Sequence, residues 1–540
     1  MQDASIAGAA QARDREVRHR AYRESGWWLG ERLQDRYVRL AGPRLDALAV
    51  TDSRGRRLTH RQLIALSQEY AEALSHAGVG RGDVALLQLP NWVEWQALFL
   101  AALRMGSIPA TIPLRTDAAS LLHVVQTTAA RAVLVPSGPM GNEARDAAAG
   151  VAAQCANPVT VLEVGSDSAL RETGKGRGSA APGQKPAALD HLMFTSSTTG
   201  RPKSVVHTMD TLAALNITFS ERFSLGADSP IFMPSPLGHS VGGIHGARLA
   251  LFNASALVLQ ERWDPEQAIA MVDEYRCAFT AAATPFLHDL VAAARPRARA
   301  KLEPLRWFLC GGAPVPPSLM DRTREEFPKT RVSVLWGMTE GGLTTCTAES
   351  PWEKYQTTCG IGLPGLEIRI LDGQGDALPP GTEGELAIRG PGVFVGYLGQ
   401  EDLYRSCLTP EEFFRTGDLA TLDADGYMRV TGRLKELIIR GGVNISPVPI
   451  EDAIAAHPGV GAVAVVGYPD PRLGERICAV IEAKDARPEL TELAEFVRAS
   501  GLPKYHCPEI LHFVDSMPRT PAGKIRKVEL RAMLAASART

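Results

Sequence analysis

Residues 194–204, FTSSTTGRPKS, place five consecutive hydroxyl side chains immediately before Gly200, and Lys203 follows closely. The mostly apolar residues 191–194, HLMF, predict the end of a short buried strand. Polar loops at strand ends are common ligand sites in α/β proteins. Backbone amides, hydroxyls and the charge of Lys203 could together surround phosphate oxygens. The segment does not match the GxxxxGK[ST] phosphate loop, and an isolated run of this kind is more often a polar surface turn.

The length and composition are those of a globular protein with several folding units. The 540 residues include 45% hydrophobic and 22% charged side chains. A formal net charge of −2 argues against a nucleic-acid surface or a polybasic membrane patch, so neither partner is expected. The eight cysteines form no CxxC pair or metal-type cluster, and no apolar run reaches the length of a signal core or membrane span. We therefore expect a cytoplasmic protein.

The first part of the chain alternates helical and strand-like patterns. Helices are predicted at residues 62–74 and 92–104, and strands at 83–89 and 132–135. Such alternation is typical of a mostly parallel α/β layer. Residues 173–187, rich in Gly, Pro and Lys, are predicted to form a flexible surface loop.

Two later segments repeat the layout of the opening stretch. Residues 306–310, RWFLC, predict a strand that runs into GGAP, and residues 332–336, VSVLW, predict one that runs into GMTE. Three strand ends followed by glycine or hydroxyl loops predict one shared crevice at the carboxyl edge of a sheet.

The residue pattern changes twice toward the C-terminus. Beyond about residue 357, short strands with Gly/Pro turns predict a small β-rich module, and an α+β pattern follows residue 433. We expect an α/β multidomain fold: a large N-terminal domain (residues 1–432) of layered α/β subdomains plus a small β-barrel-like module. A small α+β C-terminal domain (residues 433–540) would be hinged to it.

Several residues could carry chemistry, although each signal is weak alone. Glu340 offers a hard carboxylate suited to Mg²⁺, and Thr339 offers an oxygen ligand for phosphate, yet GMTE could be an ordinary helix start. Asp418 could accept hydrogen bonds from ribose hydroxyls, although an Asp in a turn is the commoner event. Lys524 follows a glycine in an expected loop, where a lone lysine is usually solvated.

The ordered set of motifs is specific. FTSSTTGRPK, CGGAP, WGMTE, TGD, GRLKELIIRGG and PRTPAGKIRK, spread over nearly the whole chain, resemble the adenylate-forming superfamily. This superfamily includes acyl-CoA synthetases, firefly luciferase and the adenylation domains of peptide synthetases. AYRESGWW, MPSPLGHSVG and WGMTE look most like bacterial cyclohexanecarboxylate-CoA and medium-chain acyl-CoA ligases.

The resemblance implies a two-step reaction with ATP, Mg²⁺ and coenzyme A. A carboxylic acid attacks the α-phosphate of ATP to give an acyl-adenylate, and a thiol then displaces AMP. Two alternatives stay open: an enzyme that loads a carrier protein, and a nucleotide-binding homologue with weakened catalysis. No long insertion separates GLPGLEIRILD from GELAIRG, which favours CoA over a carrier protein. A homodimer is also left open.

The resemblance assigns roles to residues of the large domain. The β- and γ-phosphates would lie on a mobile loop made of Thr195, Ser196, Ser197, Thr198, Thr199, Gly200 and Lys203. The adenine would lie beside Gly312, Ala313 and Pro314 and next to the residues Trp336, Gly337 and Met338, with Trp336 stacking in place of the usual Tyr. Thr339 would contact the α-phosphate, Glu340 would hold Mg²⁺, and Asp418 and Arg433 would bind the ribose.

The remaining assignments concern the acid, the thiol and the hinge. Lys524 would bridge the substrate carboxylate and the α-phosphate in the first step, and Lys435 would be the hinge that later removes it. Gly441 and Gly442 would line the pantetheine tunnel. His239 and Gly243 would border the acyl pocket, although a satisfied core histidine explains His239 equally well.

Three positions depart from the family pattern. Ser197 and Ser204 replace glycines, and Pro449 replaces a carboxylate. If the loop needs positive φ at either serine, the strain costs about 1 kcal/mol and slows adenylation. None of these changes removes a charged catalytic group, so we expect an active enzyme that is slower or more selective.

Overall fold

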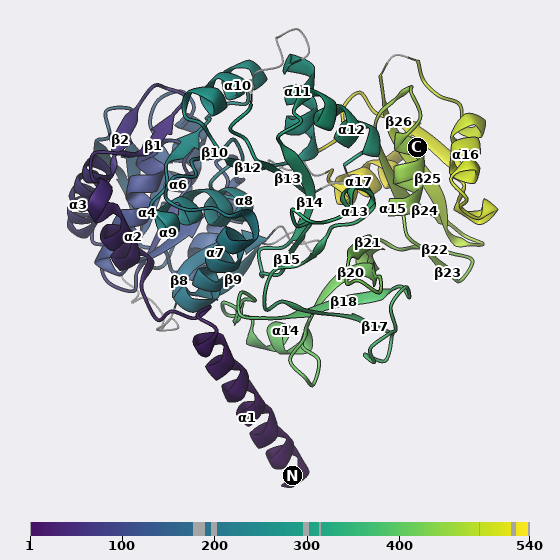
Figure 1. The fold of residues 1–540 in the computed structure, drawn as a ribbon, viewed down its shortest axis with the longest axis horizontal. Coiled ribbons are helices and arrows are strands. Elements are labelled where there is room, and N and C mark those ends of the chain that lie inside the picture. Colours follow the sequence, from purple (N-terminus) through teal and green to yellow (C-terminus); the bar gives the residue numbers. More distant parts are fainter. Residues whose placement is uncertain are drawn as a thin grey trace.

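The computed structural model describes residues 2–176, 189–195, 202–294, 302–312, 315–484, 486–519 and 525–537. Figure 1 shows a large body of sheets and helices, a small sheet beside it and a C-terminal unit at one end. Helix α1 (Gln2–Glu24) projects away from the body, and its Arg15 and Arg18 both pair with Glu412. No helix in the described part of the chain has the length and apolar character needed to span a membrane.

An eight-stranded sheet contains β8 and β9, the strands on either side of the hydroxyl run. Its order is β19-β9-β8-β4-β3-β5-β6-β7, and its inner strands are parallel. The strands are β3 (Val84–Leu87), β4 (Ile108–Thr111), β5 (Ala132–Pro136), β6 (Thr160–Val164), β7 (Leu170–Lys175), β8 (Leu189–Thr195), β9 (Lys203–Thr208) and β19 (Gly396–Tyr397). The strands predicted at 83–89, 132–135 and 191–194 are confirmed. The loop predicted from residue 173 is wrong at its start, because residues 173–175 belong to β7, which pairs with β6.

A nine-stranded sheet follows the order β16-β15-β14-β13-β12-β10-β11-β1-β2. The strands are β1 (Leu48–Asp52), β2 (Arg57–Thr59), β10 (Ile231–Met233), β11 (Leu257–Leu259), β12 (Phe279–Ala282), β13 (Trp307–Gly311), β14 (Arg331–Gly337), β15 (Leu343–Thr345) and β16 (Ile361–Gly362). The strands from β14 to β1 run parallel. The strands predicted at 306–310 and 332–336 are therefore confirmed as neighbours β13 and β14.

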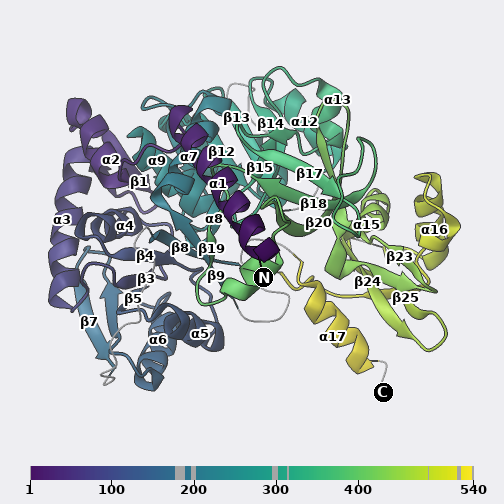
Figure 2. The same ribbon diagram turned by 90° about the horizontal axis from the view of Figure 1, so that it is seen from below.

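Helices cover both faces of the parallel strands, as a parallel sheet requires. Val84 and Leu86 of β3 pack with α5 and α6, whereas Ala85 and Leu87 pack with α4 on the other face. Figure 2 shows α5 and α6 together on one side of β3 and β5. Helix α4 is buried all round, because the same apolar cluster joins it to strands of both large sheets.

The helices of the large part agree with the predicted pattern where one was made. The predictions at 62–74 and 92–104 are confirmed as α3 and α4, and a capping box of Thr59 and Gln62 sets the start of α3. The helices are α2 (Leu33–Ala41), α3 (His60–His76), α4 (Val93–Met105), α5 (Ala118–Thr128), α6 (Asn142–Gln154), α7 (Met209–Phe223), α8 (Ser240–Gly242), α9 (Leu249–Asn253), α10 (Pro265–Glu274), α11 (Thr284–Ala294), α12 (Pro317–Glu326), α13 (Trp352–Thr357) and α14 (Glu401–Ser406).

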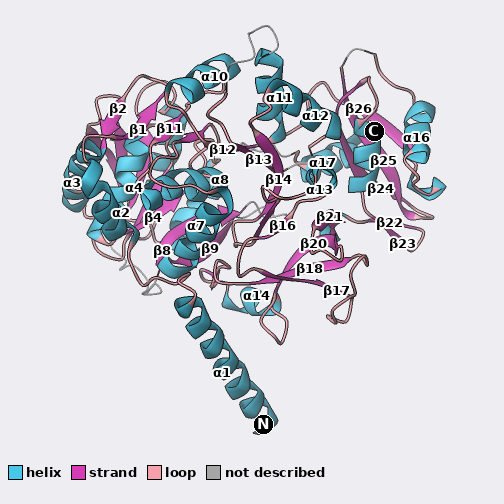
Figure 3. Ribbon diagram, viewed as in Figure 1, coloured by secondary structure: helices cyan, strands magenta, loops and turns pink. Residues whose placement is uncertain are grey.

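Two smaller sheets complete the fold (Figure 3). An antiparallel sheet holds β17 (Glu367–Leu371), β18 (Gly384–Arg389), β20 (Phe414–Leu422) and β21 (Met428–Arg433). The C-terminal unit holds β22 (Ile438–Arg440), β23 (Val443–Ile445), β24 (Val460–Asp470), β25 (Gly474–Ala483), β26 (Ile510–Phe513), α15 (Val448–Ala455), α16 (Leu490–Ala499) and α17 (Lys527–Ser537). It has its own apolar core around Ile450, Ile477 and Leu493, as expected of a separate folding unit.

The C-terminal unit touches β21 where the chain enters it. Ser446 donates a hydrogen bond from Oγ to the carbonyl oxygen of Thr431 over 2.5 Å. A Cβ on Gly432 would lie 2.3 Å from the same Oγ, so only glycine permits this approach. The junction between the two units is therefore tightly packed at residues 431–432, just before the predicted hinge.

Candidate active site

The expected shared crevice at one sheet edge needs correction. Strands β13 and β14 are neighbours in the nine-stranded sheet, but β8 belongs to the eight-stranded sheet. The two sheets are joined by His207 of β9, whose Nε2 donates to the carbonyl oxygen of Thr339 over 2.8 Å. Burial lowers the pKa of His207 to about 4, so the imidazole is neutral at this junction. The WGMTE segment thus lies at the carboxyl edge of the nine-stranded sheet, where that sheet meets the eight-stranded one.

Glu340 is buried at this junction, with 5% of the residue exposed. Tyr397 donates its hydroxyl to Oε1 of Glu340 over 2.7 Å, and Lys203 Nζ lies 4.8 Å from the centroid of the Tyr397 ring. Burial raises the pKa of Glu340, and the Tyr397 hydrogen bond opposes this shift. The carboxylate therefore lies in a site that an additional cation would stabilise. Sequence reasoning missed Tyr397, because the residues around it carry no recognisable motif.

The turn after Glu340 depends on two glycines. Gly341 and Gly342 have φ of +96° and +80°, in the left-handed region that other residues avoid. A Cβ on Gly341 would lie 2.3 Å from the carbonyl oxygen of Gly392, so the backbones approach directly. The sequence motifs assigned Gly341 and Gly342 no role, although two adjacent glycines directly after WGMTE are a signal of a tight turn.

Trp336, Asp418 and Arg433 form a second group beside Glu340. Trp336 donates from Nε1 to Oδ2 of Asp418 over 2.9 Å, and Arg433 Nε lies 2.8 Å from Oδ1. The pairing of β20 with β21 sets Asp418 directly opposite Arg433. Three residues expected at the nucleotide are thus brought together from positions up to 97 residues apart in the sequence. The Asp418 carboxylate has a donor on each oxygen, which fixes its orientation.

The residues expected at the acyl group follow the carboxyl end of β10. His239 lies just before α8, and Gly243 donates its backbone N–H to the His239 carbonyl over 2.7 Å. A Cβ on Gly243 would lie 3.1 Å from the Leu237 carbonyl oxygen and 3.7 Å from His191 Cε1. A π-helical turn, Gly243–Arg248, begins here, and such turns are frequent at functional sites. The segment therefore lies at the same edge of the nine-stranded sheet as WGMTE.

The C-terminal residues of interest lie apart from this group. Lys435 is exposed in the 3₁₀ turn Leu434–Glu436. Gly441 and Gly442 have φ of +58° and +83° and form the tight turn between β22 and β23. Figure 1 shows β22 and β23 in the C-terminal unit at one end of the molecule, apart from β14.

Several expected residues lie outside the described part of the chain: Ser196, Ser197, Thr198, Thr199, Gly200, Ala313, Pro314 and Lys524. Their flanks are described. Thr195 at the end of β8 pairs with Lys203 at the start of β9, and Gly312 has φ of +89°. Ser204 is buried in β9 without positive φ, so this departure from the pattern carries no backbone strain. Pro449 lies in the first turn of α15, where proline is tolerated.

The fold and these groups define a multidomain α/β protein with a charged site between two sheets and a small C-terminal unit. Family models identify it further: the AMP-binding enzyme model matches residues 39–398, and the AMP-binding enzyme C-terminal domain model matches residues 449–524. The chain therefore belongs to the AMP-binding enzyme family. It is an AMP-forming acid–thiol ligase, as the motifs predicted.

Individual relatives agree over nearly the whole chain. It is 31% identical to a medium-chain fatty-acid–CoA ligase of Escherichia coli (strain K12), over 96% of this chain and 93% of that protein. It is also 31% identical to a salicyl-AMP ligase / salicyl-S-ArCP synthetase of Mycobacterium tuberculosis (strain ATCC 25618 / H37Rv), over 94% and 91%. The structure of ATP-bound MatB from Rhodopseudomonas palustris superposes with a TM-score of 0.81 at 26% identity, covering 93% of this chain and 98% of that one.

Proposed function

We propose that the chain joins an apolar monocarboxylic acid to coenzyme A through an acyl-adenylate, with Mg-ATP bound beside β14. The observation that carries this proposal is the pair of buried carboxylates at the end of β14. Asp418 is held by a tryptophan and an arginine, whereas Glu340 is hydrogen-bonded by neutral donors, the Tyr397 hydroxyl and its own backbone N–H. The oriented carboxylate of Asp418 is suited to the nucleotide, and the carboxylate of Glu340, whose charge has no direct cationic partner among the described residues, is suited to its metal ion.

The oriented carboxylate would bind the sugar of ATP. Trp336 and Arg433 neutralise and fix Asp418, and its remaining lone pairs can accept hydrogen bonds from the two ribose hydroxyls. Trp336 would place its ring against the adenine, and Gly312, Ala313 and Pro314 would border the base. Thr339 would contact the α-phosphate, and the loop from Thr195 to Lys203 would hold the outer phosphates.

The residues present fit a magnesium ion held mainly by substrate. Among the described residues no three His, Cys, Asp or Glu side chains cluster as a metal site, so the chain would supply Glu340 alone. Mg²⁺ is commonly held by one or two carboxylates together with phosphate oxygens and water. Burial raises the pKa of Glu340, so a cation bound beside its carboxylate would favour the charged form. When bound, the ion would neutralise phosphate charge.

The first step joins two anions that repel each other. A carboxylate oxygen of the acid would bond to the α-phosphorus while pyrophosphate leaves, and Lys524 would hold both partners in place. Lys203, over the Tyr397 ring, would add positive charge beside the phosphates. Burial of His207 keeps its imidazole neutral, so it holds the two sheets together without adding charge.

The second step needs a different arrangement of the C-terminal unit. The thiol sulfur of CoA would attack the acyl carbonyl carbon, AMP would leave, and the thiol proton would pass to solvent. Rotation about Lys435 would withdraw Lys524 and bring the Gly441–Gly442 turn to the site. This rotation would break the Ser446 hydrogen bond to Thr431, which lies directly at the junction.

The acid is proposed to be apolar with one carboxylate. His191 lies beside Gly243, and burial lowers its pKa well below the ordinary value. Arg248 is buried but already paired with Asp190 over 2.7 Å. Neither residue is left as a free cation for a second carboxylate. The relative from Escherichia coli, named for medium-chain fatty acids, supports the same class.

Two assays test the function. Carboxylate-dependent exchange between ATP and pyrophosphate is expected across a panel of octanoate, cyclohexanecarboxylate, benzoate, acetate and succinate, strongest for an apolar acid. AMP release should then require free CoA. Release that requires a carrier protein instead would favour the carrier-loading alternative, which the salicyl-S-ArCP relative motivates. Absence of exchange with every acid would refute the ligase proposal.

A cytoplasmic location is proposed as well, supported by eight free cysteines.

A further inference from the structure

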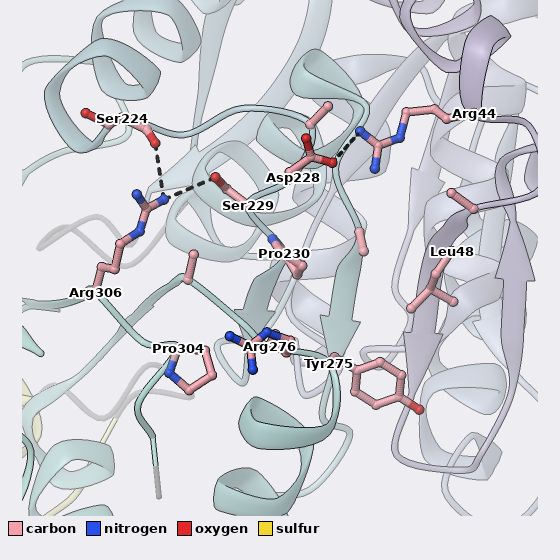
Figure 4. A pocket seen from close by; sticks show the side chains of 14 residues that line it. Arg44, Leu48, Ser224, Asp228, Ser229, Pro230, Tyr275, Arg276, Pro304 and Arg306 are labelled. Carbon is pink, nitrogen blue, oxygen red and sulfur yellow. Dashed lines mark hydrogen bonds and ion pairs between the residues drawn. The ribbon is translucent and has the colours of Figure 1, made fainter. Parts of the chain in front are cut away.

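A cavity of about 590 Å³ opens at the opposite edge of the nine-stranded sheet (Figure 4). Its lining includes residues that start or immediately precede five parallel strands: Leu48 for β1, Pro230 for β10, Ala256 for β11, Ala278 for β12 and Arg306 for β13. The WGMTE segment follows the other end of the same sheet. The cavity is therefore separate from the proposed adenylation site.

The charged lining of this cavity is mostly positive. Arg44, Arg276 and Arg306 line it together with Asp228, which gives a formal charge of +2. Arg44 Nη1 lies 3.1 Å from Oδ1 of Asp228. Arg306 donates from Nη2 to the Ser224 carbonyl oxygen and to Ser229 Oγ, both over 3.2 Å. These contacts leave other guanidinium N–H groups of Arg306 available to a ligand.

Arg276 is unusual in its backbone conformation and in the contacts of its side chain. Its φ is +52°, in the left-handed region, directly after helix α10, where glycine is strongly favoured. The turn is closed by the Cys277 N–H, which donates to the Val272 carbonyl over 2.9 Å. Within the described residues its guanidinium has no hydrogen bond or ion pair, and Figure 4 shows it between Tyr275 and Pro304. Arg276 and Arg306 are both exposed at the cavity, so their free guanidinium N–H groups are accessible to a bound anion.

The remaining lining is apolar or aromatic. Leu48, Pro230 and Pro304 line the cavity together with the ring of Tyr275. We infer that this cavity binds a small organic polyanion, whose phosphate or carboxylate groups lie on Arg276 and Arg306. Its carbon skeleton packs against Tyr275 and Pro304. Guanidinium groups suit both oxyanions, because their planar N–H pairs match two oxygens at once.

Calorimetry and hydrogen exchange on the full chain test this site with sodium pyrophosphate and sodium citrate as probes. Sodium chloride at matched ionic strength is the control. Binding should slow exchange in segments covering residues 224–230, 275–278 and 304–306. Protection by pyrophosphate alone identifies a phosphate site, by citrate alone a carboxylate site, and by both a general polyanion site. Localised protection separates this cavity from any binding of pyrophosphate near β14.

Variants distinguish binding at this cavity from a general effect of the protein's positive charge. Arg276→Gly should weaken probe binding at least about tenfold, the effect of losing a charged hydrogen bond. Its melting temperature should stay equal or rise, because glycine relieves the left-handed strain. Arg306→Gln provides a second test if Arg276→Gly does not fold. Arg322→Gln, on α12 outside the cavity, removes the same charge and should leave binding unchanged. The inference is overturned if neither probe protects these segments, or if both cavity variants bind like the parent protein.

Discussion

Two groups of carboxylates in this molecule, one half-buried and one buried, have their negative charge balanced in different ways. In the C-terminal unit, Lys527 Nζ lies 3.0 Å from Glu436 and 2.9 Å from Glu451. At the end of β14, Glu340 has a tyrosine hydroxyl, and the nearby Lys203 faces the tyrosine ring. Burial lowers the pKa of Lys527, but the two glutamates outweigh it and the net pKa is raised. The pKa of Glu340 is raised chiefly by burial.

The difference separates stability from function. The Lys527 group ties α17 to α15 and to the turn beside Lys435, so the chain itself supplies the cation. The Glu340 group lacks such a cation, and we propose that substrate supplies it. Changes at the first group should therefore affect folding, and changes at the second should affect catalysis.

The largest effect is expected at Lys524, the lysine proposed to enter the site. Lys524→Ala should slow acid-dependent ATP–pyrophosphate exchange by about 10²–10³-fold, because it removes a charge placed where the transition state develops. Thioester formation from a synthetic acyl-adenylate and CoA should change little. Lys484→Ala, an exposed lysine of the same unit, is the matched control. Undiminished exchange in Lys524→Ala would contradict the proposed mechanism.

The next effect concerns folding. Lys527→Met should lower the free energy of unfolding by about 3 kcal/mol, because it leaves two half-buried glutamates without their cation. Urea denaturation followed by circular dichroism measures this change. Lys504→Met removes an exposed lysine from the same unit and should alter stability by less than about 0.5 kcal/mol. Equal stability of the two variants would show that the Lys527 group does not hold α17 in place.

Glu340→Gln, unlike Lys527→Met, should lower activity without lowering stability. Exchange activity should fall about 10²-fold, a typical loss for one electrostatic group, while stability at neutral pH should stay equal or increase. A carboxyl whose folded pKa is raised contributes stability below its unfolded pKa and loses it as pH rises through the folded value. The stability gained by Glu340→Gln should therefore vanish on acidification toward the ordinary glutamate pKa. Thermal melts at several pH values measure this, and a strongly destabilised variant at neutral pH would assign Glu340 a structural role.

The sequence predicted the elements and the separate motifs, but not their contacts. Strands β13 and β14 begin and end within one residue of their predicted bounds, because apolar runs followed by glycine are local signals. The hydrogen bond from Tyr397 to Glu340 spans 57 residues, and that from Lys527 to Glu436 spans 91. Such contacts depend on how sheets pack, which no local pattern encodes. The division of β8 and β13 between two sheets was missed for the same reason.

The smallest effect tests how Asp418 is oriented. Trp336→Phe keeps an aromatic ring but removes the indole N–H that donates to Oδ2 of Asp418. Losing one hydrogen bond to a charged group should raise KM for ATP about tenfold, with kcat changed less. Trp352→Phe, on α13, is the matched control. Trp336→Leu removes the ring as well and should raise KM further if the ring stacks on adenine. An unchanged KM in Trp336→Phe would mean that Arg433 alone orients Asp418. The difference between the oriented Asp418 and the less compensated Glu340 would then depend on one ion pair.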